Sequence, residues 1–177
     1  MALFAFTALF VFLTFVADGP GRAGAADSGK AAATTQAPST PAQPYLVMTG
    51  KSVEETVRDL QSENKVRNLI EGAGVGCRVF IQHDKDVSSS QAEVHDGADD
   101  VFIILEGTAS LTLGGKLDAP KQAQPGEWRS GVITGGKDFK VSKGDVIVVP
   151  RGTAHRRTTG GQEVTLMVIK SFAPSAK

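Results

Sequence analysis

The chain has little of the chemistry on which several large protein classes depend. Its 177 residues include one cysteine, Cys77, so neither an internal disulfide nor a cysteine-rich zinc cluster can form. The sequence also contains no glycine-rich phosphate-binding loop and no nucleophilic serine motif. We therefore exclude a disulfide-stabilised scaffold, nucleotide binding and nucleophilic hydrolysis as leading interpretations.

The chain also lacks an excess of charge and is poor in aromatic residues. Its 19 basic and 19 acidic residues give a formal net charge of zero, which argues against a nucleic-acid partner and against an anionic membrane surface. Aromatic residues make up 6% of the sequence and glycine occurs 20 times, which suits short strands joined by turns better than a helical bundle. The length is sufficient for one domain.

No lysine or arginine precedes the apolar run at the N-terminus. This run, residues 2–17, is shorter than the roughly 20 residues of a membrane-spanning helix, and Gly-Pro at 19–20 ends it. The "AGA" at 23–25 fits an A-x-A cleavage site, so residues 1–25 are predicted to be a signal peptide. The mature protein would then be secreted or periplasmic, with no stable membrane insertion after processing. The missing basic residues favour the alternatives, an uncleaved N-terminal membrane anchor or a misplaced start codon.

The next segment has the composition of a linker. Residues 26–44, "ADSGKAAATTQAPSTPAQP", contain no large apolar side chain. Such a segment cannot bury enough surface to offset the entropy that it would lose on ordering. We predict a flexible linker here, followed by a folded domain of residues 45–177.

The folded part begins with one helical segment and continues as short strands. In "SVEETVRDLQ", Ser52 and Glu55 have capping-box spacing, and apolar residues lie on one helical face. Runs rich in β-branched residues follow, separated by Gly, Pro, Asp or Ser, at residues 77–83, 101–105, 109–115, 145–150 and 163–170. The pattern predicts an all-β antiparallel sandwich or barrel with a short N-terminal helix.

Two of these strand ends carry histidines close to carboxylates. In "EVHDGADDVFIILEG", His95 precedes a turn and Asp100 stands at the entrance to the next strand. In "GDVIVVPRGTAH", Pro150 ends one strand, Gly152 permits a tight turn, and His155 begins the next strand. Residues near shared turns of antiparallel strands lie close in space, so the two histidines and Asp100 could meet around a metal ion. Such a ligand set, with positions open to water or substrate, suits Fe(II), Mn(II) or Zn(II).

The second of these segments resembles a motif of the cupin superfamily, whose members are double-stranded β-helix (jelly-roll) barrels. The motif contains Gly, Pro, Gly and His at a spacing that Gly144, Pro150, Gly152 and His155 match in full. Thr159 stands where the family often has Asn. The resemblance implies a jelly-roll barrel with His155 among its metal ligands.

The first segment resembles the other cupin motif, with two departures. His95, Asp100 and Gly107 match the second histidine, the glutamate and the closing glycine of that motif. Glu93 replaces the first histidine, and Asp100 replaces glutamate. The resemblance covers about residues 75–170 and is to small single-domain bacterial cupins with a barrel of the cupin-2 type.

Glu93 decides between two interpretations of the site. It is two residues from His95, so on a strand both side chains share one face, and a buried carboxylate needs a partner. We predict Glu93, His95, Asp100 and His155 as metal ligands, with Asp100 reaching the ion directly or through water, and Glu93 as a candidate catalytic base. The alternative is a degenerate cupin in which the carboxylates are solvated at the barrel mouth and His155 only hydrogen-bonds to a neighbour.

Three further residues have open roles. We expect His83 to be an exposed strand-end residue; if it points inward, it could replace the missing histidine. Arg157 shares a face with His155 and could meet an anionic substrate, pair with Glu93, or be a surface charge. The segment 114–143 could form an extra hairpin at the barrel mouth, with Trp128 lining the pocket, sealing a dimer or packing on the sheet.

The sequence therefore predicts an exported metal-binding cupin that binds or transforms a small molecule. An Fe(II) site would fit dioxygenation, and a redox-inert metal would fit isomerase or lyase chemistry. The alternative function is a non-enzymatic binding or sensing cupin with a degenerate or empty metal site. Sheet edges and the resemblance to cupins also suggest a homodimer.

Overall fold

The structure of the protein, a computed structural model, describes residues 40–41, 44–72, 75–88 and 90–173. The predicted signal peptide and most of the predicted linker lie outside the described residues. Among the helices of the described residues, none is both long enough and apolar enough to cross a membrane.

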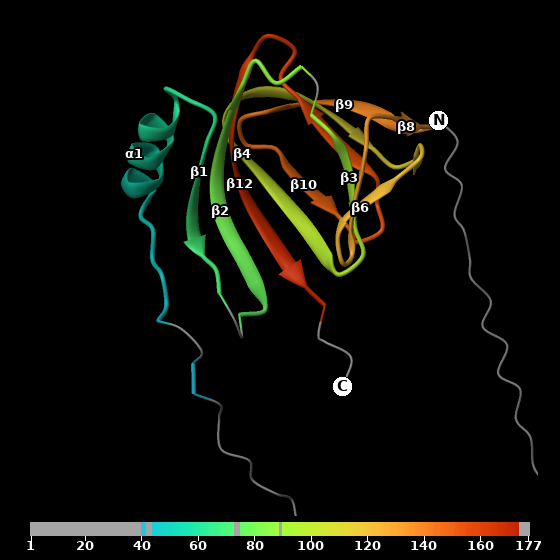
Figure 1. The fold of residues 1–177 in the computed structure, drawn as a ribbon. Helices are drawn as coiled ribbons and strands as arrows, with labels where there is room; N and C mark the ends of the chain where they lie inside the picture. The colour runs from blue at the N-terminus through green and yellow to red at the C-terminus, as the bar shows by residue number, and fades with distance from the viewer. Residues whose placement is uncertain (1–39, 42–43, 73–74, 89, 174–177) are drawn as a thin grey trace, which may run out of the picture. The chain divides into compact units, whose positions relative to one another are not determined.

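One helix and twelve strands make up the described part of the chain (Figure 1). In chain order they are α1 (Gly50–Leu60), β1 (Lys65–Ile70), β2 (Cys77–Lys85), β3 (Ala92–His95), β4 (Ala98–Leu113), β5 (Lys116–Leu117), β6 (Lys121–Gln124), β7 (Glu127–Ser130), β8 (Ile133–Thr134), β9 (Lys137–Ser142), β10 (Val146–Val149), β11 (His155–Thr158) and β12 (Glu163–Phe172).

The strands form two antiparallel sheets that share β4. Sheet A has the order β1-β2-β12-β4-β10. Sheet B has the order β6-β7-β3-β11-β4-β9, and β5 and β8 form a separate small pair. Figure 1 shows the two sheets curving around a common interior, with α1 outside the sheet next to β1. The predicted all-β jelly-roll barrel with a short N-terminal helix is confirmed.

Strand β4 is continuous where the sequence predicts two strands, at 101–105 and 109–115. Up to Gly107 it pairs with β12 and β10, and from Thr108 onward it pairs with β9 and β11. Gly107 has a φ of +77°, and a side chain there would collide with the backbone of Glu163. The glycine therefore does not end the strand but lets it pass from one sheet to the other, so the predicted break is wrong.

The helix begins earlier than the sequence predicts. Thr49 is its N-cap, and the Thr49 side-chain oxygen accepts a hydrogen bond from the backbone N–H of Ser52 at 3.2 Å. Ser52 thus lies inside the first turn, and its predicted capping role is wrong. The predicted apolar face is confirmed, because Val57 and Leu60 are buried where α1 packs against β2.

The hydrophobic core fixes the strands that carry the site. Its buried side chains come from β4, β9, β10 and β12, with Leu111, Val164 and Leu166 almost fully buried. A one-residue slip of β4 against β12 would turn these side chains out of the core. The core therefore sets which residues of β4 and β12 face the barrel interior.

Candidate metal centre

Strand β3 delivers Glu93 and His95 to the interior of the barrel. The two residues are separated by one position, so their side chains project to the same face, and both line the same cavity. Val94, between them, pairs with Trp128 on the neighbouring strand β7. The predicted shared face of Glu93 and His95 is confirmed.

Strand β11 brings His155 beside Glu93. The two residues are direct partners across the β3–β11 pair. The turn before β11 is tied to the first motif, because the backbone N–H of Gly152 donates to the carbonyl oxygen of His95 at 2.8 Å. Gly152 has a φ of +78°, which favours glycine at this turn. The two sequence motifs therefore meet in space, as predicted.

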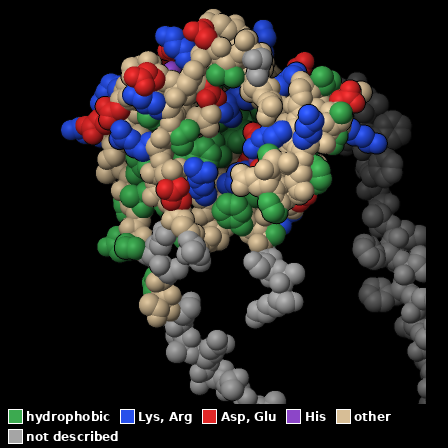
Figure 2. Space-filling view, in the orientation of Figure 1, with side chains coloured by type: hydrophobic (Ala, Val, Ile, Leu, Met, Phe, Trp, Pro, Cys, Tyr) green, Lys and Arg blue, Asp and Glu red, His purple; other side chains and the backbone are tan. Residues whose placement is uncertain are grey.

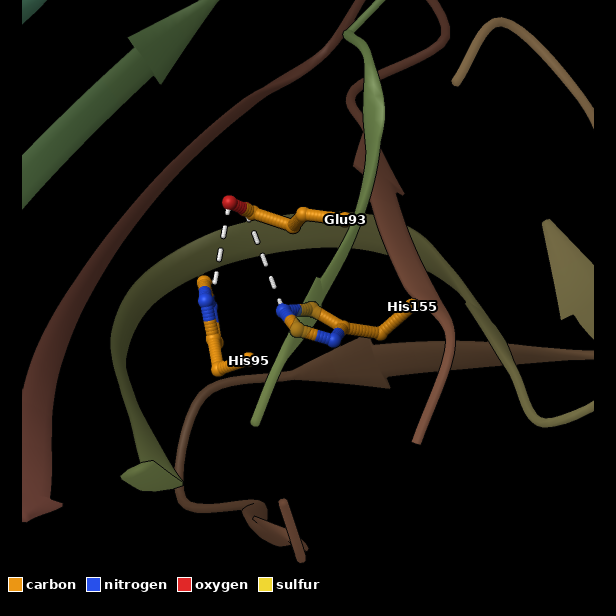
Figure 3. A group of neighbouring side chains, drawn as sticks. All are labelled: Glu93, His95 and His155. Carbon is orange, nitrogen blue, oxygen red and sulfur yellow. Dashed lines mark ion pairs between the residues drawn. The ribbon is translucent and has the colours of Figure 1, made fainter. Parts of the chain in front are cut away.

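Three side chains converge from these strands. One ligand atom each from Glu93, His95 and His155 lies within 4.8 Å of the others. The Glu93 carboxylate is 3.8 Å from His95 Nε2 through one oxygen and 3.8 Å from His155 Nε2 through the other. Figure 3 shows Glu93 pointing toward both imidazole rings. The His155 Nε2 atom is buried and has no hydrogen-bond partner among the described residues.

Asp100, near the start of β4, lies beside this cluster. Its Oδ2 atom is 3.2 Å from His95 Nε2 and 3.7 Å from His155 Nε2, and its side chain is only 4% exposed. Ligands about 2.1 Å from a common ion lie about 3.0–3.4 Å apart at octahedral or tetrahedral angles. The 3.2 Å separation lies within this range, and the 3.7 and 3.8 Å separations are slightly wider. Glu93, His95 and His155 therefore fit a divalent ion after small side-chain movements, and Asp100 lies beside both histidines. Their role as ligands stays a prediction.

The protonation of the two histidines follows from their neighbours. Burial lowers the pKa of His155 below its usual 6.5, and its Nδ1 lies 3.0 Å from the Thr153 carbonyl oxygen. Because a carbonyl only accepts, Nδ1–H donates, and the lone pair of the neutral ring lies on Nε2, facing the site. A neutral imidazole with this tautomer is the form that binds a metal.

His95 lies between two carboxylates. Burial lowers its pKa, but the hydrogen bond with Asp100 and the negative charges of Asp100 and Glu93 outweigh burial, so the pKa is raised from 6.5. The His95 Nδ1–H donates to Glu127 Oε2 at 2.6 Å, and Nε2 faces Asp100. Without a metal, a proton on Nε2 would bridge to Asp100; a bound ion would take the place of that proton.

Asp100 is ionised at neutral pH. Burial raises its pKa, but the hydrogen bond with His95 and the charge of Lys170 outweigh burial, so the pKa is lowered from 3.8. Lys170 Nζ lies 3.2 Å from Asp100 Oδ1, because the two residues are direct partners across the β4–β12 pair. The carboxylate is therefore negatively charged and available to a cation.

Sequence reasoning missed Glu127, Arg129 and Lys170. Glu127 and Arg129 lie two residues apart on β7, opposite His95 and Glu93, and Arg129 is 2.7 Å from Glu93 Oε2. The segment 114–143 was expected to form an extra hairpin, which the β6–β7 pair confirms. Alternation would have placed Glu127 and Arg129 on one face, but no sequence signal gives the register of β7 against β3.

The cluster lies at one side of a cavity of about 720 Å³ between the two sheets. Figure 2 shows the molecule hollowed on this face, with lysine and arginine side chains around the hollow. Apolar side chains also line the cavity; they are Phe80, Val87, Phe102, Pro125, Val168 and Phe172. The cavity is large enough for a small molecule next to the candidate ligands.

His83, Arg157 and Trp128 lie in different surroundings in the structure. His83 is 1% exposed and lies outside the cavity lining, so the expected exposure is wrong, and it does not replace the missing histidine. Its Nδ1 lies 2.8 Å from the hydroxyl of Thr165 on β12. Arg157 lines the cavity but pairs with Asp84 at 2.6 Å. Trp128 does not line the cavity.

A search of solved structures found similar folds at low sequence identity. The protein BH2720 from Bacillus halodurans is 18% identical, with 76% of this chain and 86% of that chain covered and a TM-score of 0.54. A cupin superfamily protein from Desulfitobacterium hafniense is 18% identical, with 63% and 81% covered and a TM-score of 0.42. A cupin-like protein from Thermotoga maritima is 16% identical, with 60% and 66% covered and a TM-score of 0.43. No family model and no curated protein matches the chain.

Proposed function

Because the chain has the fold of the cupin superfamily, we propose that it is a metal-dependent cupin that binds and transforms a small molecule in its barrel. The observation that carries this proposal is the buried His155 Nε2, which has no partner among the described residues and faces Glu93 and Asp100. A buried polar atom without a partner destabilises the fold by about 1–3 kcal/mol, unless a ligand satisfies it. A divalent ion would satisfy it.

The residues of the site would have two kinds of role, holding the ion and orienting the residues that hold it. His95 and His155 would hold the ion through Nε2, and Asp100 and Glu93 would hold it through carboxylate oxygens. Glu127 fixes the ring of His95, and the Thr153 carbonyl fixes the ring of His155. When bound, the metal would supply Lewis-acid or redox chemistry at positions open to the cavity.

Glu93 has a second role in this proposal. It is about one-third exposed, whereas Asp100 is buried, so Glu93 is the carboxylate that faces the cavity more openly. A Glu93 that leaves the metal could take a proton from a substrate, as a base in isomerase or lyase chemistry. A Glu93 that stays bound to the metal would instead fit chemistry of the dioxygenase type.

A specific observation favours the second candidate function, a non-enzymatic binding or sensing cupin. Arg129 and Lys170 already neutralise Glu93 and Asp100 through ion pairs of 2.7 and 3.2 Å. The negative charges of Glu93 and Asp100 are therefore paired with positive charges even without a metal. In this function the cavity would hold a small molecule by its polar wall, and no reaction would follow.

Metal analysis separates the two functions. The purified protein is stripped with a chelator, reconstituted separately with Fe(II), Mn(II) and Zn(II), desalted and measured by elemental analysis. We expect about one ion per chain with at least one metal, and loss of that ion in His155→Ala. If no metal binds under any condition, the metal-dependent function is wrong and the empty-site function stands.

Matched variants show whether the loss is specific. His83→Gln removes another buried histidine that lies outside the cavity, and Glu106→Gln removes a carboxylate that pairs with Lys143. Both should keep the metal, while Glu93→Gln should bind it more weakly. A Glu93→Gln variant with unchanged metal affinity would remove Glu93 from the ligand set.

Export is a separate part of the proposal and rests on the sequence. The short apolar run and the "AGA" at 23–25 support a cleaved signal peptide, which would place the domain in a secreted or periplasmic compartment. Mass spectrometry of the mature protein from its native host tests it. A product that begins near residue 26 supports cleavage; one that retains residues 1–17 indicates an anchor.

A further inference from the structure

The lysine, arginine and carboxylate side chains of the cavity wall balance one another in charge. Four bases and four acids line it, namely Arg78, Arg129, Arg157, Lys170, Asp84, Glu93, Asp100 and Glu127. The formal charges of these eight side chains, with the two histidines left out of the sum, add up to zero. The carboxylates of the described wall are therefore matched by its bases, and none of their negative charge is left over for an added cation.

The pairing is direct at the candidate ligands. Each of the two carboxylates faces a base across a strand pair: Glu93 faces Arg129 across β3–β7, and Asp100 faces Lys170 across β4–β12. The distances are 2.7 Å and 3.2 Å. Neither base is freely solvated, since the side chains of Arg129 and Lys170 are 28% and 14% exposed.

A divalent ion would change this balance by two positive charges. Its charge would draw on the same carboxylate oxygens that hold Arg129 and Lys170, so both bases would lose part of their counter-charge. A partly buried base without a counter-charge is costly. The metal-loaded cavity therefore needs about two negative charges from a molecule that enters it.

We propose that the metal-loaded cavity binds a small organic dianion, of the dicarboxylate class, and that Arg129 and Lys170 select it. This inference rests on the proposed metal-dependent function and adds the substrate class. Lys170 offers ammonium donors and Arg129 offers a planar pair of donors that matches a carboxylate. The apolar wall, including Phe80, Phe102 and Val168, accommodates the hydrocarbon body between the acid groups.

A matched ligand series tests the proposal. Succinate, succinamate and succinamide have nearly the same shape but carry two, one and no negative charges. Their binding to the Mn(II)- or Zn(II)-loaded protein is measured by titration calorimetry, with malonate, glutarate, phthalate and inorganic phosphate as further probes. We expect affinity to fall roughly tenfold for each charge removed, and succinate to bind the metal-free protein roughly tenfold more weakly.

Variants of Lys170 and Arg129 distinguish a role in ligand selection from a purely structural role. A loss of structure would weaken both dicarboxylate binding and metal binding. Lys170→Met keeps an unbranched side chain that is one atom shorter, but removes the charge that competes for Asp100. It should weaken dicarboxylate binding roughly tenfold and at the same time strengthen metal binding. Arg129→Gln should weaken dicarboxylate binding similarly, and it carries the test if Lys170→Met does not fold. Lys143→Met, an exposed base paired with Glu106, is the control and should change neither affinity.

The outcomes distinguish this inference from the function on which it rests. Absence of bound metal overturns the proposed function. Bound metal with equal affinity for succinate, succinamate and succinamide, and no preference for any other dicarboxylate over a neutral molecule, overturns the inference alone. Tight binding of phosphate without binding of any dicarboxylate also overturns it, because the anion would then belong to another class.

Discussion

Glu93 lies between a base and an imidazole on its own sheet. Arg129 is 2.7 Å from one carboxylate oxygen, and His155 Nε2 is 3.8 Å from the other. A neutral histidine at position 93, as in the motif that the chain resembles, could not form an ion pair with Arg129. The glutamate therefore gives the site a negative charge that both a metal and a neighbouring base can use, and this links metal binding to the state of Arg129.

The hydrogen bond from His95 to Glu127 provides a first prediction. Glu127→Gln keeps the size of the side chain but removes the charge that holds the Nδ1–H of His95 at 2.6 Å. Loss of such an orienting partner typically lowers metal affinity about 10–100-fold. Metal titration of the wild-type and variant proteins measures the change. Glu106→Gln is the matched control, and equal affinity in wild type and Glu127→Gln would show that Glu127 does not orient the ring.

A second prediction concerns acid stability at the rim of the site. Hydrogen bonds from the Arg151 side chain and backbone lower the pKa of Asp99 to about 2 from its usual 3.8. A lowered folded-state pKa stabilises the fold above pH 3.8, and this contribution is lost as the pH falls toward 2. Asp99→Asn should therefore be less stable than wild type at pH 5–7, with the gap closing near pH 2. Denaturant unfolding across this range tests it, and a gap that stays constant would contradict the ion pair as its cause.

At the scale of elements, β4 depends on one glycine. An alanine at position 107 would keep the unfavourable φ of +77° and place its Cβ against the backbone of Glu163. Gly107→Ala should therefore destabilise the fold by about 3 kcal/mol, as backbone strain and overpacking combine. The free energy of unfolding in denaturant measures this change.

Gly97→Ala is the matched control for that variant. Gly97 lies in the turn before β4, where an added Cβ would meet no atom within 4 Å. Its substitution should change the free energy of unfolding by less than about 1 kcal/mol. If both variants unfold alike, Gly107 does not have the structural role described above.

Most strands could be predicted from the sequence, but the pairing between strands could not. β-branched runs bounded by turn residues predicted β2, β10 and β12, since such local patterns depend on neighbours in sequence. The break predicted near Gly107 failed because a glycine in a strand has the same local signature whether it ends the strand or lets it change sheets. The distinction depends on Glu163, which is far along the chain.

At the scale of the whole molecule, the candidate site combines local and distant information. The histidines and carboxylates stand in short motifs, so the sequence predicted His95, Asp100 and His155 as neighbours. Arg129 and Lys170 stand in no motif, and they reach the site only through the register of β7 and β12. Register is set by core packing over the whole barrel, which periodicity alone does not reveal.

The last prediction follows from the position of the site between the sheets. Glu93, His95 and His155 come from sheet B, whereas Asp100 lies in the part of β4 that pairs within sheet A. An ion held by all four would join the two sheets and would bind only the folded state. At a free concentration of a hundred times its Kd, such an ion stabilises the fold by about 2.7 kcal/mol. For a domain of this size the melting temperature should rise on the order of 10 °C.

Thermal unfolding of chelator-stripped protein, with and without added Mn(II) or Zn(II), measures this rise, and His155→Ala should lose it. The variant is informative even if it is less stable than wild type, because each protein is compared with itself in the presence and absence of the metal. A full rise in His155→Ala would mean that the ion stabilises the chain from another place. Because His155 is buried at the site between the sheets, a rise confined to the wild type would place the stabilising ion at this site in the folded barrel rather than on its surface.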